Sequence, residues 1–537
     1  MNTCDSPLSI PLVVQLGFAG SRNLLDGSAH HGPAGSSDLE GQVCQLLAGI
    51  ISNLPAKLGL SPQHFLCGIS QIAIGGDAVF TRACQSLKIP QRVFLPQHLD
   101  EYLAAVGSEG PDFSPNQKQI ARDLLSDPHV IQQRVVSDAA TRQIRFADTN
   151  LEIVRSSDVI LCLVREGQLS KPGGTLEMIE MARKRGRSVL LVTLHLEKGK
   201  PVLKSKWFNQ DSFQPPALPH HLRDILPMPL SGLKGGTLEM PALPTARTYA
   251  EHLKKQSSEL SKAHKGLFRS AAFIIITTHI LATVCAVIAV QFHEKLAHGL
   301  YGFLVPELLL LALGFVIHHR LHRRESTHLW ATSRLIAELG RSVVAIGKQY
   351  LYLEYLFHLP FPASLSSLLR TLNVLHLSST SRNIDANDWQ ANRDSYIHQR
   401  LEGKNGQIEF YARESTSATN LLNKAHTAFN VFSLAAFAAT LCKLTHVFGG
   451  SSGSILGPLA ILLPVLAVAA LSLAAAFDLK ARQHTFADML VFLRAQHKLL
   501  NDATTDREFG QLVLETESRL LGETVNWYSR RSFTGIA

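Results

Sequence analysis

Four apolar stretches in the second half of the chain constrain its fold more than any other feature. They cover residues 270–292, 299–319, 429–448 and 454–477 of the 537-residue sequence. Each is close to the length of about 20 apolar residues that a helix needs to cross a bilayer. Short polar or Gly/Ser-rich turns join the first to the second and the third to the fourth. We therefore expect an all-α membrane region with four transmembrane helices in two hairpins.

Basic residues gather at one end of both hairpins. They precede the first span, follow the second and follow the fourth: Lys254, Lys255, Lys262, Lys265, Arg269, Arg320, Arg323, Arg324, Lys480 and Arg482. Cytoplasmic flanks of membrane helices carry such an excess, so the N-terminus and the C-terminus are both expected in the cytoplasm. Much of the formal net charge of +9 therefore lies at the edges of the membrane. The expected partner of these basic residues is the lipid bilayer, and no nucleic acid is expected.

The first two hundred residues show a different pattern, in which short apolar runs alternate with helical stretches. Such alternation predicts an α/β, Rossmann-like parallel sheet covered on both faces. The expected strands lie at residues 12–16, 71–74, 92–96, 158–164 and 188–193. We expect a nucleotide-binding domain at 1–197, a Pro-rich linker at 198–250 and two-helix transmembrane units at 251–358 and 359–537, the last with cytoplasmic helices.

Three of the expected strands are followed by glycine-rich turns. The strings are GFAGSR, AIGGDAVF and KPGGTLEMIEMAR, and the last two open a helix. Because the carboxyl ends of parallel strands share one edge, helix N-termini there present free amides to one anion. The candidate ligand-binding residues are Gly17, Gly20, Ser21, Arg22, Gly75, Gly76, Asp77, Arg165, Lys171, Gly173, Gly174, Thr175 and Glu177.

Several of these residues also have a purely structural interpretation. Asp77 and Asp158 are typical of helix caps or ribose contacts, and Glu177 is stabilised by the dipole of its own helix. Arg165 and Lys171 lie in a loop that could simply be solvated, as could His30 and His31. The repeated string GGTLEM at residues 235–240 is followed by prolines, which forbid the helix that an anion site would need. Neither catalytic nor metal-ligating residues are predicted, and seven singly scattered cysteines indicate a reducing compartment without structural zinc.

The order of these turns resembles the SLOG superfamily of Rossmann-like nucleotide-binding domains. The resemblance rests on Gly17, Gly20, Ser21 and Arg22, then Gly75, Gly76 and Asp77, then Ser157, Asp158, Gly173, Gly174, Thr175 and Glu177. It implies binding of a nucleotide-derived ligand, related to ADP-ribose or to a cyclic nucleotide. The GGTLE spacing lacks two residues of the loop found in the phosphoribohydrolase branch of that superfamily, which argues against that activity.

The membrane half resembles the SLATT family of two-helix membrane domains. Each half repeats a basic helix, a hairpin and a long amphipathic helix, and the stretch at residues 394–432 together with ETVNWYSRR carries the likeness. The combination of SLOG and SLATT domains is typical of prokaryotic anti-phage defence proteins. It implies a multi-pass protein of the bacterial inner membrane that forms a homo-oligomer.

Three functions fit the sequence. The first is a membrane effector gated or assembled by a nucleotide second messenger, in which Glu307 of the second span is a candidate pore carboxylate. The second is a membrane-tethered nucleotide N-glycosidase, in which Arg22 or Arg165 holds phosphate and Glu177 stabilises an oxocarbenium charge. The third is a passive membrane scaffold. The sequence favours a ligand-binding effector over an enzyme, with no cofactor beyond the nucleotide ligand.

Overall fold

The chain folds into two compact units in the computed structural model. The structure describes residues 10–22, 24, 35–107, 110–168, 173–218, 245–291, 301–323, 326–348, 351, 353–380, 388–404, 406–445 and 449–533. The first unit contains Met1–Tyr249, Tyr352–Glu354 and Phe361–Ala386, and the second contains Ala250–Leu351, Tyr355–Pro360 and Asn387–Ala537. The segment 361–386 therefore belongs with the N-terminal sheet, although its position in the sequence is between the two membrane hairpins.

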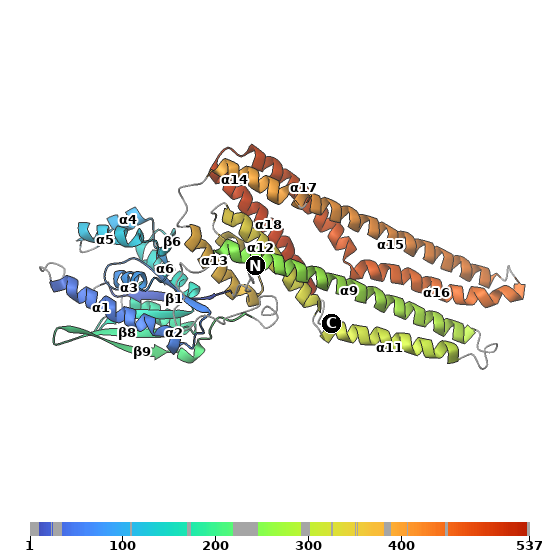
Figure 1. Ribbon diagram of the computed structural model, residues 1–537, viewed down its shortest axis with the longest axis horizontal. Helices are drawn as coiled ribbons and strands as arrows, with labels where there is room; N and C mark the ends of the chain where they lie inside the picture. The colour runs from blue at the N-terminus through green and yellow to red at the C-terminus, as the bar shows by residue number, and fades with distance from the viewer. Residues whose placement is uncertain are drawn as a thin grey trace, which may run out of the picture. The chain divides into compact units, whose positions relative to one another are not determined.

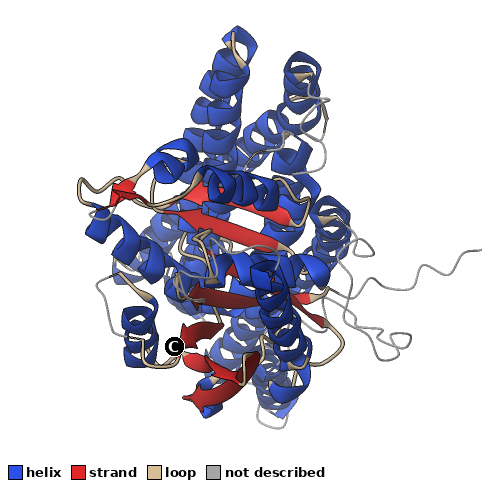
Figure 2. Ribbon diagram, turned by 90° about the vertical axis from the view of Figure 1, so that its left-hand side faces the viewer, coloured by secondary structure: helices blue, strands red, loops and turns tan. Residues whose placement is uncertain are grey.

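The first unit is built on a seven-stranded sheet, whose strands are drawn as red arrows in Figure 2. The strand order is β6-β3-β2-β1-β7-β8-β9, and all neighbours are parallel except β8 and β9. The strands are β1 (Leu12–Gly20), β2 (His64–Ser70), β3 (Gln91–Leu95), β6 (Val130–Val135), β7 (Val159–Arg165), β8 (Ser188–Glu197) and β9 (Lys200–Phe208). The predicted parallel Rossmann-like sheet is confirmed.

Three details of the predicted strands were wrong. The second strand is His64–Ser70 rather than 71–74, because the residues after Ser70 form the turn into the next helix. The strand Val130–Val135 was missed since only its first half is buried, so it forms no apolar run. Lys200–Phe208 lies in the predicted linker but pairs antiparallel with β8 as an edge strand, and its middle residues Lys204, Ser205 and Lys206 are polar and exposed.

Helices cover both faces of the sheet. They are α1 (Gly35–Ser52), α2 (Leu54–Lys57), α3 (Gly76–Ser86), α4 (Leu99–Ala104), α5 (Pro115–Leu125), α6 (Arg142–Ser156) and α7 (Thr175–Lys184), with a short hairpin of β4 (Val106–Gly107) and β5 (Gly110–Pro111). Helices α1 and α3 close one core, in which Phe18 stacks on Phe80 at 4.2 Å between ring centroids. Helices α6 and α7 close the core on the other side. Burial of both faces explains the continuous apolar runs of the central strands.

A further helix, α13 (Ser366–Thr380), completes the first unit by packing against β1 and β6. Its Thr371 hydroxyl accepts a hydrogen bond from the Val13 amide at 3.0 Å. Its Arg370 pairs with Asp158 at 2.5 Å, and the Asp158 carboxylate also accepts from the Gln15 amide at 2.9 Å. Asp158 is therefore a structural anchor for α13 in this fold.

The second unit is helical, and its long helices run in pairs in Figure 1. Its helices are α9 (Ala246–Gln291), α11 (Tyr301–Arg323), α12 (Ser326–Lys348), α14 (Trp389–Tyr396), a π-helical turn (Ile397–Leu401), α15 (Gln407–Leu444), α16 (Gly449–Ala476), α17 (Leu479–Asp502) and α18 (Asp506–Phe533). Within the described residues four helices are long and apolar enough to cross a membrane: α9, α11, α15 and α16. The predicted four-helix membrane region is confirmed.

Small residues allow close packing among these helices. A Cβ on Gly314 of α11 would lie 2.8 Å from the ring of His279 in α9, so the hairpin needs glycine there. A Cβ on Gly340 of α12 would lie 2.8 Å from the Ala250 carbonyl oxygen of α9. Helix α15 packs along α16 and α17, and α12 packs along α18.

Candidate functional site

The first two glycine turns are in direct backbone contact. A Cβ on Gly20 would lie 2.4 Å from the Gly76 Cα, so the end of β1 meets the start of α3 with no room for side chains. Gly75 has φ of +81°, a conformation that L residues rarely adopt, and a Cβ there would lie 2.3 Å from the Arg22 carbonyl oxygen. The Gly76 amide donates to the Ser21 carbonyl at 3.0 Å.

Asp77 locks the same junction from inside. Its Oδ1 accepts from the Gly20 amide and its Oδ2 from the Ala73 amide, both at 3.1 Å. Burial raises the pKa of Asp77 to about 7, although these two amides lower it. The carboxyl group therefore fixes the turns, and the amides of Asp77 and Ala78 are left as donors with no acceptor in the described part of the chain.

These turns lie at the point where the strand order reverses. Strands after β1 are added on one side as β2, β3 and β6, whereas β7 and β8 are added on the other side. Ligands of open α/β sheets bind in the crevice at such a switch point, outside the carboxyl ends of the strands. Here the Ser21 amide donates to the Leu163 carbonyl at 2.9 Å, and the Ser21 hydroxyl also bonds the Gln168 side chain. Arg165 is the last residue of β7 and so lies at the same carboxyl edge of the sheet.

The third turn joins the same edge through α6. Gly173 has φ of +72°, and a Cβ there would lie 3.1 Å from the Phe146 Cβ. The Asn150 side chain donates to the Gly173 carbonyl at 2.9 Å and accepts from Gln71 at 2.9 Å. Because Gln71 belongs to the turn that leads into α3, this buried bridge connects the second and third glycine turns.

The acidic residue of the third turn closes its own loop. The Glu177 carboxylate accepts a hydrogen bond from the Gly173 amide, and Gly174 is the N-cap of α7 ahead of the buried Thr175. Among the described residues the Thr175 amide has no acceptor, so the start of α7 offers a donor to an anion. Lys171 lies outside the described residues, as do His30, His31 and the second GGTLEM string.

A cluster that the sequence did not predict surrounds Arg22. The Asp112 carboxylate pairs with Arg22 at 3.2 Å and also with Arg142 in the first turn of α6. The Arg22 and Arg142 side chains are 40% and 42% exposed, so both could reach a ligand. Burial raises the pKa of Tyr102 far above its ordinary value, and the charges of Asp77, Arg22, Asp112 and Arg142 all act on it. The only sequence signal for this cluster was the basic stretch at the start of α6.

Gly17 has a structural task. A Cβ at Gly17 would lie 2.3 Å from the Ser157 hydroxyl, whose own hydrogen bond goes to the Ile153 carbonyl at 2.6 Å. Gly17 therefore allows β1 to pack on the end of α6 rather than facing the crevice.

The spans carry a few ionisable residues and prolines. Glu307 is half-buried next to Pro306 in α11 and has no ion pair with another described residue. The His279 Nδ1 bonds the Ile275 carbonyl within α9 at 2.8 Å. Pro464 is accommodated inside α16, and Lys443 lies in the last turn of α15, whereas His446 lies outside the described residues.

Comparisons with protein-family models, with curated proteins and with solved structures found no match to this chain. The function is therefore inferred from the geometry of the residues and from the sequence motifs described above.

Proposed function

We propose that the first unit binds a phosphate-bearing nucleotide at the switch point between β1 and β7, and that this ligand controls the membrane helices. The observation that carries the proposal is the convergence of three glycine turns on this one edge. Two of them touch through Gly20 and Gly76, and the third is tied to the second by Asn150. Helix starts that meet at one place offer several amides and dipoles to one anion.

Charge supports the same ligand class. Arg22 and Arg142 converge on Asp112 at this edge with their guanidinium groups partly exposed. Arginine can bind a phosphate through two parallel hydrogen bonds, so either group could turn from Asp112 to a ligand. The resemblance to SLOG domains suggests ADP-ribose or a cyclic relative as the messenger, and the resemblance to SLATT domains suggests a defence effector in the bacterial inner membrane.

The chain connections between the two units could transmit the effect of ligand binding to the membrane helices. The chain enters the second unit at Ala250, returns to the first unit for α13 and re-enters the second at Asn387. Helix α13 is anchored by Arg370 to Asp158, which directly precedes β7. A ligand that shifts β7 would therefore bias both hairpins through their connections, provided that it binds two conformations with different affinity.

Calorimetry on the full-length protein in neutral detergent tests the binding site. ADP-ribose, cyclic ADP-ribose and NAD serve as probes. The variant R22A/R142A should bind the active probe about 140- to 20,000-fold more weakly, since it loses two charge-assisted bonds that contribute about 1.5–3 kcal/mol each. The matched control is R183A, because Arg183 lies in the last turn of α7, at the opposite edge of the sheet, and stacks on Phe208. Equal affinity in all three proteins would refute the site.

A chemical assay separates the effector from the enzyme. The same protein is incubated with NAD and with nucleoside monophosphates, and released base is measured by chromatography. We expect no turnover, because the Glu177 carboxylate is engaged by the Gly173 amide. Sustained release of base that is lost in E177Q would favour the N-glycosidase instead.

A further inference from the structure

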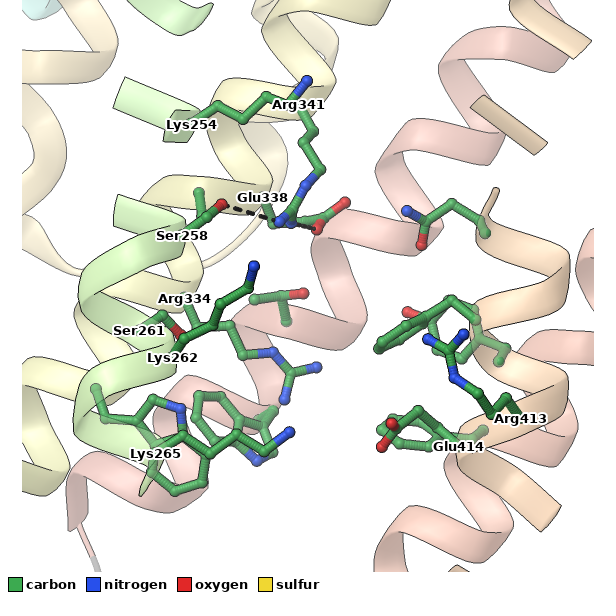
Figure 3. Close-up of a pocket in the computed structure, with 18 of the residues that line it drawn as sticks. Lys254, Ser258, Ser261, Lys262, Lys265, Arg334, Glu338, Arg341, Arg413 and Glu414 are labelled. Atoms are coloured by element: carbon green, nitrogen blue, oxygen red, sulfur yellow. Dashed lines mark hydrogen bonds and ion pairs between the residues drawn. The ribbon is translucent and has the colours of Figure 1, made fainter. Parts of the chain in front are cut away.

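A cavity lined by described residues lies within the second unit and was not indicated by the sequence. Its volume is about 840 Å³, within the range of roughly 300–1,000 Å³ typical of ligand pockets. It is enclosed by α9, α12, the π-helical turn, α15 and the ends of α17 and α18. Figure 3 shows Lys254, Ser258 and Lys265 of α9 facing Arg413 and Glu414 of α15 across it.

The position of this cavity along the spans is informative. It is lined by Arg269, directly before the apolar part of α9, and by Phe477 and Asp478, directly after α16. Trp330 and Arg413 line it from α12, which follows the second span, and from the start of α15, which precedes the third. The cavity is therefore at the level where all four apolar segments end on their basic side.

The lining carries a large excess of positive charge. Ten of its residues are Lys or Arg and four are Glu or Asp. Arg482 pairs with Glu414, and Arg531 pairs with Asp478 at 2.8 Å. Five further cations form no close ion pair with another described residue, although the charge of Glu414 acts on two of them, Lys265 and Arg269. The five are Lys254, Lys262, Lys265, Arg269 and Arg413.

A buried charge network forms the rigid side of the cavity. Arg400 is 10% exposed and binds Glu517 and Glu338, each at 2.8 Å. Burial alone would raise the pKa of Glu338, but Arg341 and Arg400 hold it at about 2. The carboxylates are thus committed to these arginines, and they do not neutralise the cations on α9.

Two of these five cations, Lys265 and Arg269, are half-buried, whereas Lys254, Lys262 and Arg413 are exposed. Lys265 is half-buried, and its burial together with the neighbouring Arg269 lowers the pKa of its ammonium group. Positive flanks of membrane helices normally face water or headgroups. An anion in the cavity would stabilise Lys265 and Arg269, because burying a charge without a close counter-charge is costly.

Aromatic rings line the same space. Trp330 and Trp527 meet edge to face at 5.0 Å between centroids. The Arg334 guanidinium lies 4.4 Å from the Trp527 ring centroid, and that of Arg531 lies 5.6 Å from Trp330. These contacts hold the arginine side chains in place and give the pocket both flat apolar walls and fixed donors.

From this convergence we propose that the cavity of the second unit binds a multiply charged phosphate group. Its source is either the headgroup of an anionic phospholipid or a soluble polyphosphate such as a nucleotide. The site is independent of the sheet edge, since every lining residue belongs to the second unit. A phosphate there would bridge α9 to α15 and so hold the first hairpin against the second.

The test uses full-length protein in neutral detergent, with sodium triphosphate as probe. Saturating triphosphate should raise the Tm of the wild type by about 5 °C, because a ligand of the folded state stabilises it by mass action. The variant K265Q/R269Q removes two of the unpaired cations and should lose this shift. Its Tm without the probe should be higher than that of the wild type, since the mutual repulsion is gone.

The matched control removes two charges from the same unit outside the cavity. Arg494 and Lys498 are exposed on α17, so R494Q/K498Q should keep the full triphosphate shift. An equal shift in both double variants, or no shift in the wild type, would overturn the proposal. The variant R22A/R142A should also keep the shift, which separates this site from the one at the sheet edge.

Nanodiscs distinguish the two sources of phosphate. If a headgroup fills the cavity, discs of phosphatidylglycerol should raise the wild-type Tm above that in phosphatidylcholine, and triphosphate should add little to it. If the ligand is soluble, triphosphate should raise the Tm equally in both kinds of disc. Either outcome must be lost in K265Q/R269Q, and stabilisation that persists in that variant would refute the site.

Discussion

Replacing Gly76 by alanine should separate the turns on which the sheet-edge site depends. The new Cβ would lie 2.4 Å from the Gly20 Cα and 3.0 Å from the Ser21 amide nitrogen. Since an ordinary contact needs at least about 3.4 Å, the start of α3 must retreat by about 1 Å. Both neighbours are backbone atoms, one at the end of the central strand β1 and one in the residue after it, so neither can rotate away as a side-chain atom could.

The cost of this retreat can be worked out from the bonds it stretches. The bond from the Gly76 amide to the Ser21 carbonyl is 3.0 Å, and that from the Gly20 amide to Asp77 is 3.1 Å. A movement of about 1 Å takes both beyond hydrogen-bond distance, at about 1 kcal/mol each. Overpacking adds about 1–3 kcal/mol, so we expect a total loss of roughly 3–5 kcal/mol.

Hydrogen exchange of the full-length protein measures this loss locally. Peptides from β1 and α3 should exchange about 140- to 3,700-fold faster in G76A, given that about 1.4 kcal/mol corresponds to a factor of ten. The control is G49A in α1, where a Cβ meets nothing within 4 Å and alanine should stabilise the helix by about 0.5–1 kcal/mol. Unchanged exchange of β1 and α3 in G76A would show that the turns are not in contact.

Three further outcomes follow from the structure. Asp77→Asn should lower the free energy of unfolding by about 1 kcal/mol, because the amide side chain can accept from only one of the two backbone amides. The pKa of Asp77 in the folded protein, about 7, lies above its unfolded value, so the stability of the wild type falls as pH rises from about 4 through about 7. The variant should lack this pH dependence. Urea unfolding of the first unit between pH 4 and 8 measures both effects. Arg400→Met should lower the stability of the second unit by about 3–5 kcal/mol by leaving the fully buried Glu517 unpaired, and this variant should become more stable as pH falls, which a Tm series detects. Gly340→Leu should force α12 away from Ala250 and accelerate exchange in both helices, whereas Gly302→Leu, with open space around it, should not.

Sequence patterns predicted those parts of the fold that depend on local apolar periodicity. The four spans and the strands β1, β3, β7 and β8 are strongly apolar, so their existence was predicted correctly. The edge strands β6 and β9 alternate or end in polar residues, and this weak pattern resembles loop. Helix α13 could not be assigned to the sheet unit, because its place is decided by Thr371 and Arg370 meeting partners far away in the sequence.

The candidate site was partly predictable for the same reason. Glycines mark turns whatever surrounds them, so Gly20, Gly76 and Gly173 were found, and the structure brings their turns to one edge. The partner of a charged side chain, in contrast, is decided by the tertiary structure. Asp158 therefore proved to hold Arg370, and the cluster around Asp112 was missed.

The return of α13 to the sheet has a consequence for synthesis. The first unit needs residues up to Ala386, which follow the first hairpin in the sequence. The ribosome must therefore have synthesised that hairpin before the Val13 amide can bond Thr371 and the Asp158 carboxylate can pair with Arg370. The first unit cannot mature ahead of the first hairpin, so a protein truncated at Tyr249 should lack the partners of Val13 and Asp158 and be prone to aggregate.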